Sequence, residues 1–537
     1  MTRPFYIANN KGETPTWMFD WGDAYGYSHY WGHITAIAML ILFGICLTLI
    51  LIYSFIQLYL TIKYKQSKKN TYQNEPELDL SKAPFVTVQL PMYNEYYVAE
   101  RIIDCIVAID YPKDKLEIQV LDDSTDETKT LVSEKVKTIK KESNIDIKHI
   151  HRSKRTGYKA GALQEGLHTA KGEFIAIFDV DFLPEIDFLQ KTIPYFKDKN
   201  IGLVQTRWGH VNKSYSLLTE LQAFGLNAHF TIEQTGRNTA GHFMNFNGTG
   251  GVWRKKCIED AGGWEHDTLT EDLDLSYRAQ LIGWKFKYLE NIVAPAELPI
   301  TMSALKSQQH RWIKGGAECL RKTAYKILTN KSLRLSDRIH GLAHLFNSSV
   351  FIFILILGLL SVPLLHIKES FGDLNVYIQY GAIFILSTLF LMYYYWVSFQ
   401  DKSTNKIKSA FRFLCRFFQF LSVSIGLSLN NAIAALQGYL GIKSSFVRTP
   451  KFNVLSKENT KQNKYDNHKL SLLTITEGIL FFLFVYSSIT CFIFLDIGLL
   501  PFHLILAFGF GYVFFKSISE IVPGKIKKPV IYRTSKV

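Results

Sequence analysis

Two acidic clusters in this sequence directly follow apolar runs rich in β-branched residues. One run leads into Asp122 and Asp123, and a later run leads into Asp179 and Asp181. Because ligands bind beyond the carboxyl ends of the strands in an open α/β sheet, the two clusters can meet in one crevice. Either cluster alone is also typical of a solvated turn or a helix cap. Carboxylate oxygens suit Mg²⁺ or Mn²⁺, so Asp179 and Asp181 are predicted to hold a divalent cation that bridges to substrate phosphates.

A basic segment that contains glycines lies between the two clusters. The sequence has neither a GxxxxGK[ST] phosphate loop nor a GxGxxG turn after its first expected strand. Phosphates would therefore be held by the metal and by cationic side chains of the segment HRSKRTGYKAGAL. A basic surface loop has a similar composition, but Gly157 and Gly161 favour close approach of the backbone to a ligand. The cationic candidates are Arg152, Lys154, Arg155 and Lys159.

A third acidic motif, Thr270-Glu271-Asp272, stands at the expected start of a helix. In the structural interpretation Thr270 caps the helix and the two acidic residues stabilise its first turn. In the functional interpretation one of the carboxylates is a general base that faces the crevice. Both interpretations can hold at once.

The motif Gln308-Gln309-His310-Arg311-Trp312 combines cationic, amide and aromatic side chains. An amphipathic helix at a membrane surface would have such a composition, since Arg and Trp are both common there. The functional interpretation gives Arg311 a diphosphate to hold and Trp312 a sugar ring to stack on.

An α/β domain is needed to position these residues, and the chain between about residues 84 and 336 has its pattern. Short apolar runs alternate there with amphipathic stretches, which predicts a parallel sheet with helices on both faces. The expected strands are Phe85–Leu90, Glu117–Leu121, Ile147–His151, Phe174–Phe178 and Gly202–Trp208. The expected helices are Val98–Ala108, Glu127–Lys141, Ala160–Thr169 and Glu185–Tyr195.

The rest of the chain is apolar enough to enter a membrane. Over all 537 residues of the chain, 47% are apolar and 20% are charged, against roughly 25% charged residues in soluble proteins. Lysines directly after the first apolar run place the N-terminus outside and the α/β domain in the cytosol. The expected spans are about 34–62, 348–367, 376–399, 471–495 and 499–515.

The segment 409–441 is also apolar, but basic residues flank both of its ends, which indicates that both ends are cytosolic. We expect an interfacial amphipathic helix followed by a re-entrant or tilted piece. The alternative is a sixth full span.

The net charge of +14 and the cysteines exclude several classes of protein. The basic residues lie beside the apolar runs and form no single patterned surface, so no nucleic-acid partner is expected. The six cysteines have no CxxC or paired spacing, which predicts neither a disulfide framework nor a zinc site.

Taken together, the motifs resemble those of the family 2 processive β-glycosyltransferases, which include the cellulose, chitin and hyaluronan synthases. They occur in the order Pro-x-Tyr-Asn-Glu, Asp-Asp-Ser-x-Asp, Lys-Ala-Gly-Ala-Leu, Asp-x-Asp, Thr-Glu-Asp and Gln-x-x-Arg-Trp. The stretch from FNGTGGVW to QQHRW is most similar to the plant cellulose-synthase-like mannan and glucan synthases and their bacterial counterparts. The resemblance covers about residues 84–330. It implies an α/β GT-A-type (Rossmann-like) cytosolic domain inserted between α-helical transmembrane segments.

The resemblance also implies a role for each motif residue. Asp272 would be the catalytic base, with Glu271 beside it. The residues that would bind the nucleotide sugar are Asp122, Asp123, Lys159, Asp179, Gln308 and Arg311, and Asp179 and Asp181 would hold Mg²⁺ or Mn²⁺. The acceptor would meet Trp312, Phe246, Asn247, Gly248 and Thr249. A segment similar to the family's cytosolic gating loop contains Phe446, Arg448, Thr449 and Lys451, with Arg448 where the family pattern has Val.

The implied domain organisation has seven parts. They are residues 1–31 as an extracytoplasmic segment, 32–63 as the first transmembrane helix, 80–336 as the glycosyltransferase domain, 340–400 as helices two and three, 405–465 as the interfacial segment and gating-like loop, 470–517 as helices four and five, and 518–537 as a cytosolic basic tail.

The expected activity is inverting, metal-dependent transfer of a hexose from UDP-glucose or GDP-mannose to a growing β-linked polysaccharide. Transfer would be processive and coupled to export through a plasma or inner membrane, with accessory export subunits as further partners. One alternative is a non-processive enzyme that glycosylates a lipid, as ceramide glucosyltransferases do, because those enzymes share the Gln-x-x-Arg-Trp motif. Another is a transporter with a nucleotide-sensing domain, which would not need the Asp272 carboxylate.

Overall fold

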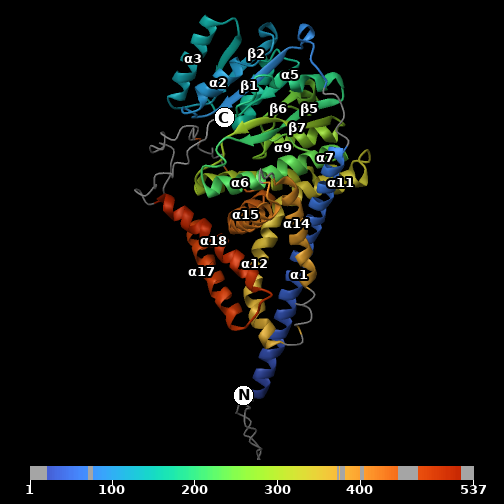
Figure 1. The fold of residues 1–537 in the computed structure, drawn as a ribbon, viewed down its shortest axis with the longest axis vertical. Coiled ribbons are helices and arrows are strands. Elements are labelled where there is room, and N and C mark those ends of the chain that lie inside the picture. The colour runs from blue at the N-terminus through green and yellow to red at the C-terminus, as the bar shows by residue number, and fades with distance from the viewer. Residues whose placement is uncertain are drawn as a thin grey trace, which may run out of the picture.

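The computed structural model describes residues 21–69, 76–371, 374, 381–399, 404–444, 451 and 470–521. A mixed α/β domain stands at one end of the molecule and a bundle of long helices extends from it, as Figure 1 shows. Helix α1 (Trp21–Lys69) runs along the bundle and ends beside the domain. The chain therefore reaches the domain from the bundle and returns to the bundle after it.

A seven-stranded sheet forms the centre of the domain, in the order β3-β2-β1-β4-β6-β5-β7. Strands β1 to β4 pair in parallel and β5 pairs in parallel with β7, but β6 is antiparallel to both β4 and β5. The strands are β1 Val86–Met92, β2 Leu116–Asp122, β3 Asp146–His151, β4 Phe174–Ile177, β5 Ile201–His210, β6 Gly251–Arg254 and β7 Lys285–Ala296.

The antiparallel strand β6 corrects the expectation of a wholly parallel sheet. Strand β5 ends at the same edge of the sheet as β4, and the next elements are helices α6 (Leu217–Ala228) and α7 (Gln234–Ala240). The chain then enters β6 from that edge and has to run back along its neighbours. The five expected strands are confirmed within a few residues, and β6 and β7 were not expected.

Helices cover both faces of the sheet. Helices α2 (Ala99–Val107), α3 (Thr128–Glu142) and α5 (Phe188–Thr192) share one apolar core with the sheet. Helices α4 (Tyr158–Thr169), α8 (Lys255–Asp260) and α9 (Glu271–Leu281) share a second core on the opposite face. Successive residues of a strand point to opposite faces, so the apolar runs of β1, β2 and β4 supply both cores.

Among the described residues, four stretches of helix are long and apolar enough to cross a membrane. They are Gly32–Lys69, Leu335–Ser370, Leu472–Ile493 and Leu500–Ile521. A shorter apolar helix, α14 (Ile385–Ser398), packs along α1. Several long apolar helices indicate a membrane protein.

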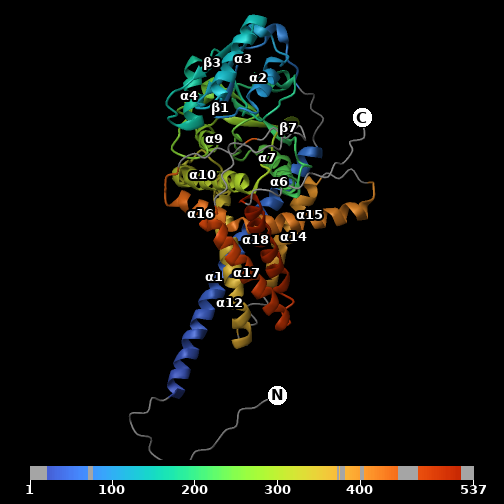
Figure 2. The same ribbon diagram turned by 90° about the vertical axis from the view of Figure 1, so that its left-hand side faces the viewer.

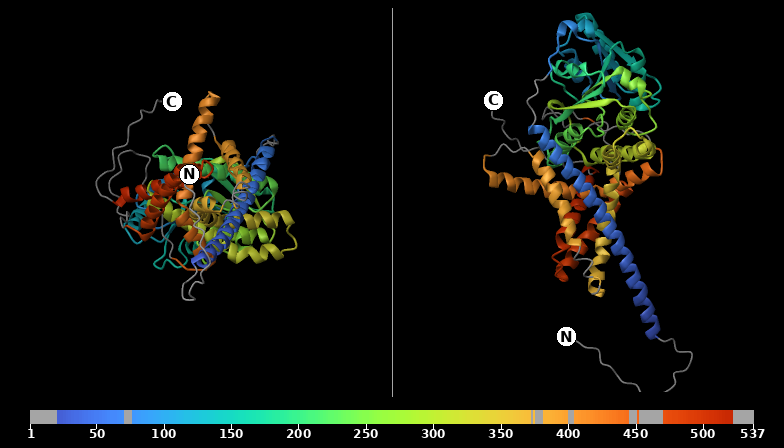
Figure 3. Two further views of the ribbon diagram at one scale, coloured as in Figure 1. Left: turned by 90° about the horizontal axis from the view of Figure 1, so that it is seen from below. Right: turned by 90° about the vertical axis from the view of Figure 1, so that its right-hand side faces the viewer.

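Three helices lie crosswise between the domain and the bundle, which Figure 2 shows most clearly. They are α10 (Met302–Thr329), α15 (Lys406–Gly426) and α16 (Ser428–Tyr439), and the axes of α15 and α16 differ by 50°. The side view in Figure 3 shows α15 projecting from the bundle while α1 slants along it. The other α-helices within the described residues are α11 Leu335–Phe346, α12 Val350–Ser370, α17 Leu472–Ile493 and α18 Leu500–Ile521.

Candidate active site

A cleft of about 180 Å³ opens where the carboxyl ends of the strands face helices α9 and α10. Twelve of the residues to which the family resemblance assigns a role line it. They are Asp123, Lys159, Asp179, Asp181, Asn247, Gly248, Glu271, Asp272, Gln308, Arg311, Trp312 and Lys451. Residues that are far apart in the sequence thus share one cleft, because β1 and β2 end in register at Met92 and Asp122 and β4 ends beside them.

Three other expected residues lie behind the cleft and support it. Asp122 is fully buried and accepts hydrogen bonds from His149 Nε2 and Ser124 N, both at 2.8 Å. Burial raises the pKa of Asp122, but these hydrogen bonds outweigh it and bring the pKa below its usual range. Thr249 Oγ1 accepts the backbone N–H of Asp179 at 2.9 Å, and the Phe246 ring is buried against Trp253. Phe446, Arg448 and Thr449 lie outside the described residues.

The basic segment after β3 divides its cations between two tasks. Arg152 forms a two-pronged ion pair with Asp123, with its Nε 2.7 Å from Oδ1 and its Nη2 2.6 Å from Oδ2. Arg155 lines the cleft, and its guanidinium lies 3.5 Å from the centre of the Tyr93 ring. Lys154 is exposed. Arg152 therefore orients Asp123, while Arg155 and Tyr93 form part of the wall.

Lys159 joins the acidic motifs of the cleft. Its Nζ donates to Asp179 Oδ1 at 2.6 Å and to the carbonyl of Gly248 at 2.8 Å, and it lies 3.9 Å from Glu271 Oε1. Burial opposes its charge, but Asp179 and Glu271 raise the pKa of Lys159, so the ammonium form persists. Gly248 has a φ of 80°, and a Cβ there would stand 3.0 Å from Asp272 Oδ2. Glycine is therefore the residue that fits between Lys159 and Asp272.

The two carboxylates at the start of α9 are held in a state ready to accept a proton. Burial, together with the neighbouring Glu271 carboxylate, raises the pKa of Asp272 to about 7. Burial also raises the pKa of Glu271, against the opposing charge of Lys159. Thr270 occupies the cap position but does not cap the helix with its side chain, since its Oγ1 lies 3.6 Å from Cys319 Sγ of α10. A carboxylate with a pKa near neutrality in a cleft is suited to general base catalysis.

Helix α10 brings a cation and an aromatic ring to the opposite wall. Burial lowers the pKa of Arg311, although Glu271, Asp179 and Asp272 oppose that shift. Trp312 lies 6.4 Å from Trp208 of β5, measured between ring centres, and Trp208 stacks on Phe230 at 4.9 Å. The wall therefore combines a guanidinium that interacts electrostatically with three carboxylates and an aromatic surface.

Lys451 approaches the cleft from the segment that follows α16. Its Nζ lies 2.7 Å from Asp181 Oδ2, which also accepts the backbone N–H of Glu297 at 3.3 Å. Asp181 is thus tied both to the residue that follows β7 and to a residue distant in sequence.

The comparisons with known proteins agree with this geometry. Residues 83–315 match the sequence model described as glycosyltransferase like family 2. The domain belongs to glycosyltransferase family 2. The expected membership, on the cellulose-synthase-like side of the family, is thereby confirmed together with the relatives described next.

Two of the relatives of this family 2 domain are plant proteins. The chain is 41% identical over 286 residues to glucomannan 4-beta-mannosyltransferase 9 of Arabidopsis thaliana, covering 52% of this chain and 54% of that one. It is 46% identical over 268 residues to probable glucomannan 4-beta-mannosyltransferase 4 of rice, Oryza sativa subsp. japonica, covering 49% of each. The chain therefore spans about half the length of the curated relatives it matches.

A solved structure shares the fold of the family 2 domain. The mannosyltransferase PcManGT of Pyrobaculum calidifontis, determined in complex with GDP-Man and Mn²⁺, superposes with a TM-score of 0.50 at 19% sequence identity. The match covers 75% of this chain and all of that one. The GT-A-type fold expected from the sequence is confirmed.

The carboxylates Asp179 and Asp181 fit a hard divalent cation by their chemistry. Both line the cleft and offer only oxygen atoms, which are the ligands that Mg²⁺ and Mn²⁺ prefer. One oxygen of each already accepts a lysine ammonium, from Lys159 and from Lys451. Each of the two carboxylates is therefore paired with a lysine ammonium in this cleft.

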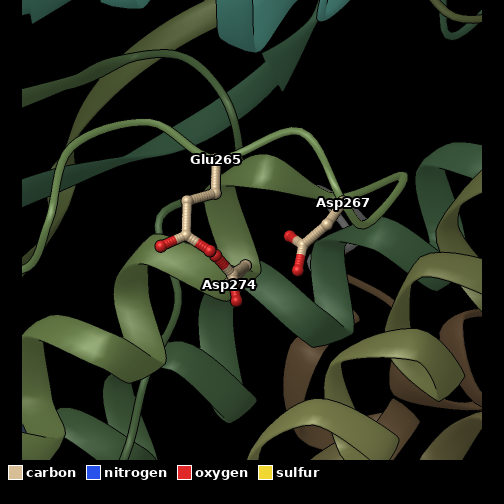
Figure 4. Close-up of side chains that lie close together, drawn as sticks. All are labelled: Glu265, Asp267 and Asp274. Atoms are coloured by element: carbon tan, nitrogen blue, oxygen red, sulfur yellow. The ribbon is translucent and has the colours of Figure 1, made fainter.

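A second acidic cluster of the domain lies around a lysine and forms ion pairs with it. Glu265, Asp267 and Asp274 converge as Figure 4 shows, with ligand oxygens within 4.8 Å of one another. Lys322 Nζ lies 2.6, 2.8 and 2.9 Å from these three carboxylates, in that order. A lysine of α10 therefore supplies the positive charge that the cluster needs.

Sequence reasoning did not assign several residues of the family 2 cleft. Trp208, at the end of an expected strand, and His210 both line the cleft, although neither has an expected role at the site. Burial, with Arg207 and Lys213 nearby, lowers the pKa of His210 to about 4, so the imidazole is neutral. Glu297, which follows β7, also lines the cleft, although the sequence indicated no role for it. The signal that would have found them is the alternation of β5 and β7, which points every second residue toward one face.

Proposed function

We propose that this protein transfers mannose from GDP-mannose to a hydroxyl of a β-linked mannan or glucomannan, with inversion at the anomeric carbon. The observation that carries the proposal is Asp272, a half-buried carboxylate with a pKa of about 7 in a cleft that also holds Lys159 and Arg311. The relatives, which are named as glucomannan 4-beta-mannosyltransferases, support mannose over glucose and a 1,4 linkage.

In the proposed reaction the donor diphosphate lies between helix α10 and the ends of β2 and β4. Arg311 and Lys159 neutralise the charge that develops on the leaving diphosphate. A divalent cation bound by Asp179 and Asp181 would supply further positive charge at the same place. Asp123, fixed by Arg152, and Arg155 line the part of the cleft left for the nucleoside.

Asp272 accepts the proton of the acceptor hydroxyl as its oxygen attacks the anomeric carbon. One base and one direct displacement invert the configuration, so an α-linked donor gives a β-linked product. Trp312 stacks on the acceptor sugar and, with Trp208, excludes water that would otherwise hydrolyse the donor.

The long apolar helices of the bundle support the proposal that the polysaccharide product crosses a membrane through this protein. Sugar hydroxyls would lack hydrogen-bond partners in hydrocarbon, so a polysaccharide needs a protein path to cross it. We infer a cytosolic family 2 domain, processive transfer and export through the plasma or inner membrane, with accessory subunits as partners. The carboxylates at 179 and 181 would bind Mg²⁺ or Mn²⁺.

The test supplies membranes that contain the protein with a panel of radiolabelled nucleotide sugars. GDP-mannose should give a polymer that a β-1,4-mannanase degrades, and membranes with Asp272→Asn should give none. A product that extracts with lipids as a single-sugar glycolipid would contradict the polysaccharide assignment. Label incorporated from UDP-glucose alone would contradict the choice of donor.

A further inference from the structure

The membrane-facing start of helix α10 is fastened by a buried ion pair. Lys306 Nζ donates to Glu477 Oε2 of α17 at 2.5 Å and to Ser517 Oγ of α18 at 2.9 Å. The Glu477 side chain is fully buried, and 10% of the Lys306 side chain is exposed. Glu477 stands in a helix that is long and apolar enough to cross a membrane. An ionisable residue in such a helix is a candidate for a functional role, with its partner.

Stability alone does not account for this ion pair. Removing two charges from water costs about as much as their attraction returns, and apolar residues of similar volume often stabilise a protein equally well. A buried ammonium and carboxylate do, however, fix the relative position of the helices that carry them. The pair is therefore suited to setting where α10 lies.

Two further contacts hold the same end of α10. Glu520 of α18 accepts the backbone N–H of Met302 at 2.6 Å and that of Ser303 at 3.2 Å, where a carboxylate also meets the positive end of the helix dipole. Asn430 of α16 donates to the backbone carbonyl of Lys306 at 3.2 Å. The first turns of α10 are thus bonded to α16, α17 and α18.

Helix α10 connects its fastened first turns directly to residues that line the cleft. Arg311 and Trp312 follow Lys306 in the same helix, less than two turns further on. Beyond them, Glu318 Oε2 accepts the backbone N–H of Leu269 at 2.7 Å, just before the catalytic carboxylates. A shift or rotation of α10 would therefore move the guanidinium, the aromatic surface and the loop before α9 together.

We propose that Lys306 and Glu477 are positioning residues that set Arg311 and Trp312 against the carboxylates Glu271 and Asp272. The proposal rests on the proposed hexosyl transfer and extends it, because it gives helices α17 and α18 a part in the chemistry.

The test compares full-length variants purified in detergent and returned to vesicles. Lys306→Met and Glu477→Gln should each lower kcat at least about tenfold and raise the KM for the acceptor, since small misplacements of catalytic groups are costly. Affinity for GMP, which lacks the β-phosphate of the leaving diphosphate, should change less than about twofold in calorimetry, because the nucleoside lies against residues outside α10. Lys306→Arg, which keeps the charge, should recover part of the lost kcat.

The double variant Lys306→Met/Glu477→Met separates positioning from mere support. Two apolar residues should restore the melting temperature of the wild type, yet kcat should stay low, because nothing then fixes the rotation of α10. The matched control is the pair Lys368 and Asp496, 2.9 Å apart near the ends of α12 and α17. Replacing it with Met and Asn should leave kcat unchanged.

Each outcome decides between the two proposals. A double variant as fast as the wild type would overturn the positioning role and leave the transferase assignment intact. A wild-type protein that releases GDP from GDP-mannose neither with nor without acceptor would overturn the transferase assignment and this role with it.

Discussion

Lys159 Nζ and Asp179 Oδ1 are 2.6 Å apart, and this contact joins the start of α4 to the end of β4 inside the cleft. The same ammonium reaches the carbonyl of Gly248 and lies 3.9 Å from Glu271. One cation is therefore shared by motifs that come from three separate stretches of the sequence.

Loss of the Lys159 charge is expected to stop transfer. Lys159→Met should lower kcat about 100- to 1,000-fold, as removal of a preorganised group that stabilises leaving-group charge does. The fall in kcat is measured as the rate of GDP release in the presence of acceptor. The control is Lys171→Met, since Lys171 is exposed and pairs with Asp146 away from the cleft. A Lys159→Met protein with more than about a tenth of the wild-type rate would remove Lys159 from the mechanism.

Asp272 is expected to be essential for chemistry but dispensable for donor binding. Asp272→Asn should lower kcat about 100- to 10,000-fold, the usual contribution of a general base. The affinity for GDP should stay within about threefold, since the base meets the acceptor. Asp260→Asn, on the exposed end of α8, serves as the control. Retention of activity by the Asp272→Asn variant would transfer the role of base to Glu271.

The rate should depend on pH through Asp272. Its pKa of about 7 lies above the usual value of an aspartate, so the carboxylate is protonated below about pH 7 and cannot accept a proton. The ratio kcat/KM should therefore rise with pH toward neutrality and level off above it. A profile measured at saturating metal checks this. No change between about pH 5.5 and 8 would contradict the assignment of the base.

Chelation should stop transfer without unfolding the protein. If Asp179 and Asp181 hold a divalent cation, EDTA should abolish GDP release, and Mn²⁺ or Mg²⁺ should restore it. The melting temperature should stay the same, because Lys159 and Lys451 already neutralise these carboxylates. Full activity after exhaustive chelation would remove the cation from the reaction.

The acidic cluster around Lys322 should behave as an ion-pair cluster. Lys322→Met leaves the fully buried Asp274 with Arg278 as its remaining cation, so unfolding should become easier by about 3 kcal/mol. Chemical denaturation measures this loss. Lys256→Met, an exposed lysine paired with Asp260, should change stability by less than about 1 kcal/mol. A fall in stability on adding EDTA to the wild type would instead identify a bound metal there.

The local pattern of the sequence predicts most of the sheet but not its pairing. Strands β1, β2, β4 and β5 contain apolar runs that can be recognised on their own, whereas β3 has only two isoleucines among polar residues. Strand β6 has four residues and follows three consecutive glycine or threonine residues, so it carries no periodic signal. Strand β7 alternates lysine, aromatic and acidic residues and is recognised only through its parallel partner β5.

The residues of the candidate site also divide into those that the local sequence indicates and those that depend on tertiary packing. Residue type and position at a strand end or helix start indicated Asp123, Asp179, Asp272 and Arg311, all of which line the cleft. Asp122 supports the cleft from behind through a hydrogen bond with His149 of a neighbouring strand. Thr249 does so through a hydrogen bond from the backbone N–H of Asp179. Such partners are set by tertiary packing, which no local pattern encodes.

The stretch that matches the family 2 model ends at residue 315, part-way along α10, whose first backbone N–H groups are capped by Glu520 near the far end of the chain. A soluble fragment cut at that boundary would lose the cap, the partner of Lys306 and the second half of the helix. Biochemistry on an excised catalytic module would then report how it holds a nucleotide, while sugar transfer would need the intact protein in lipid.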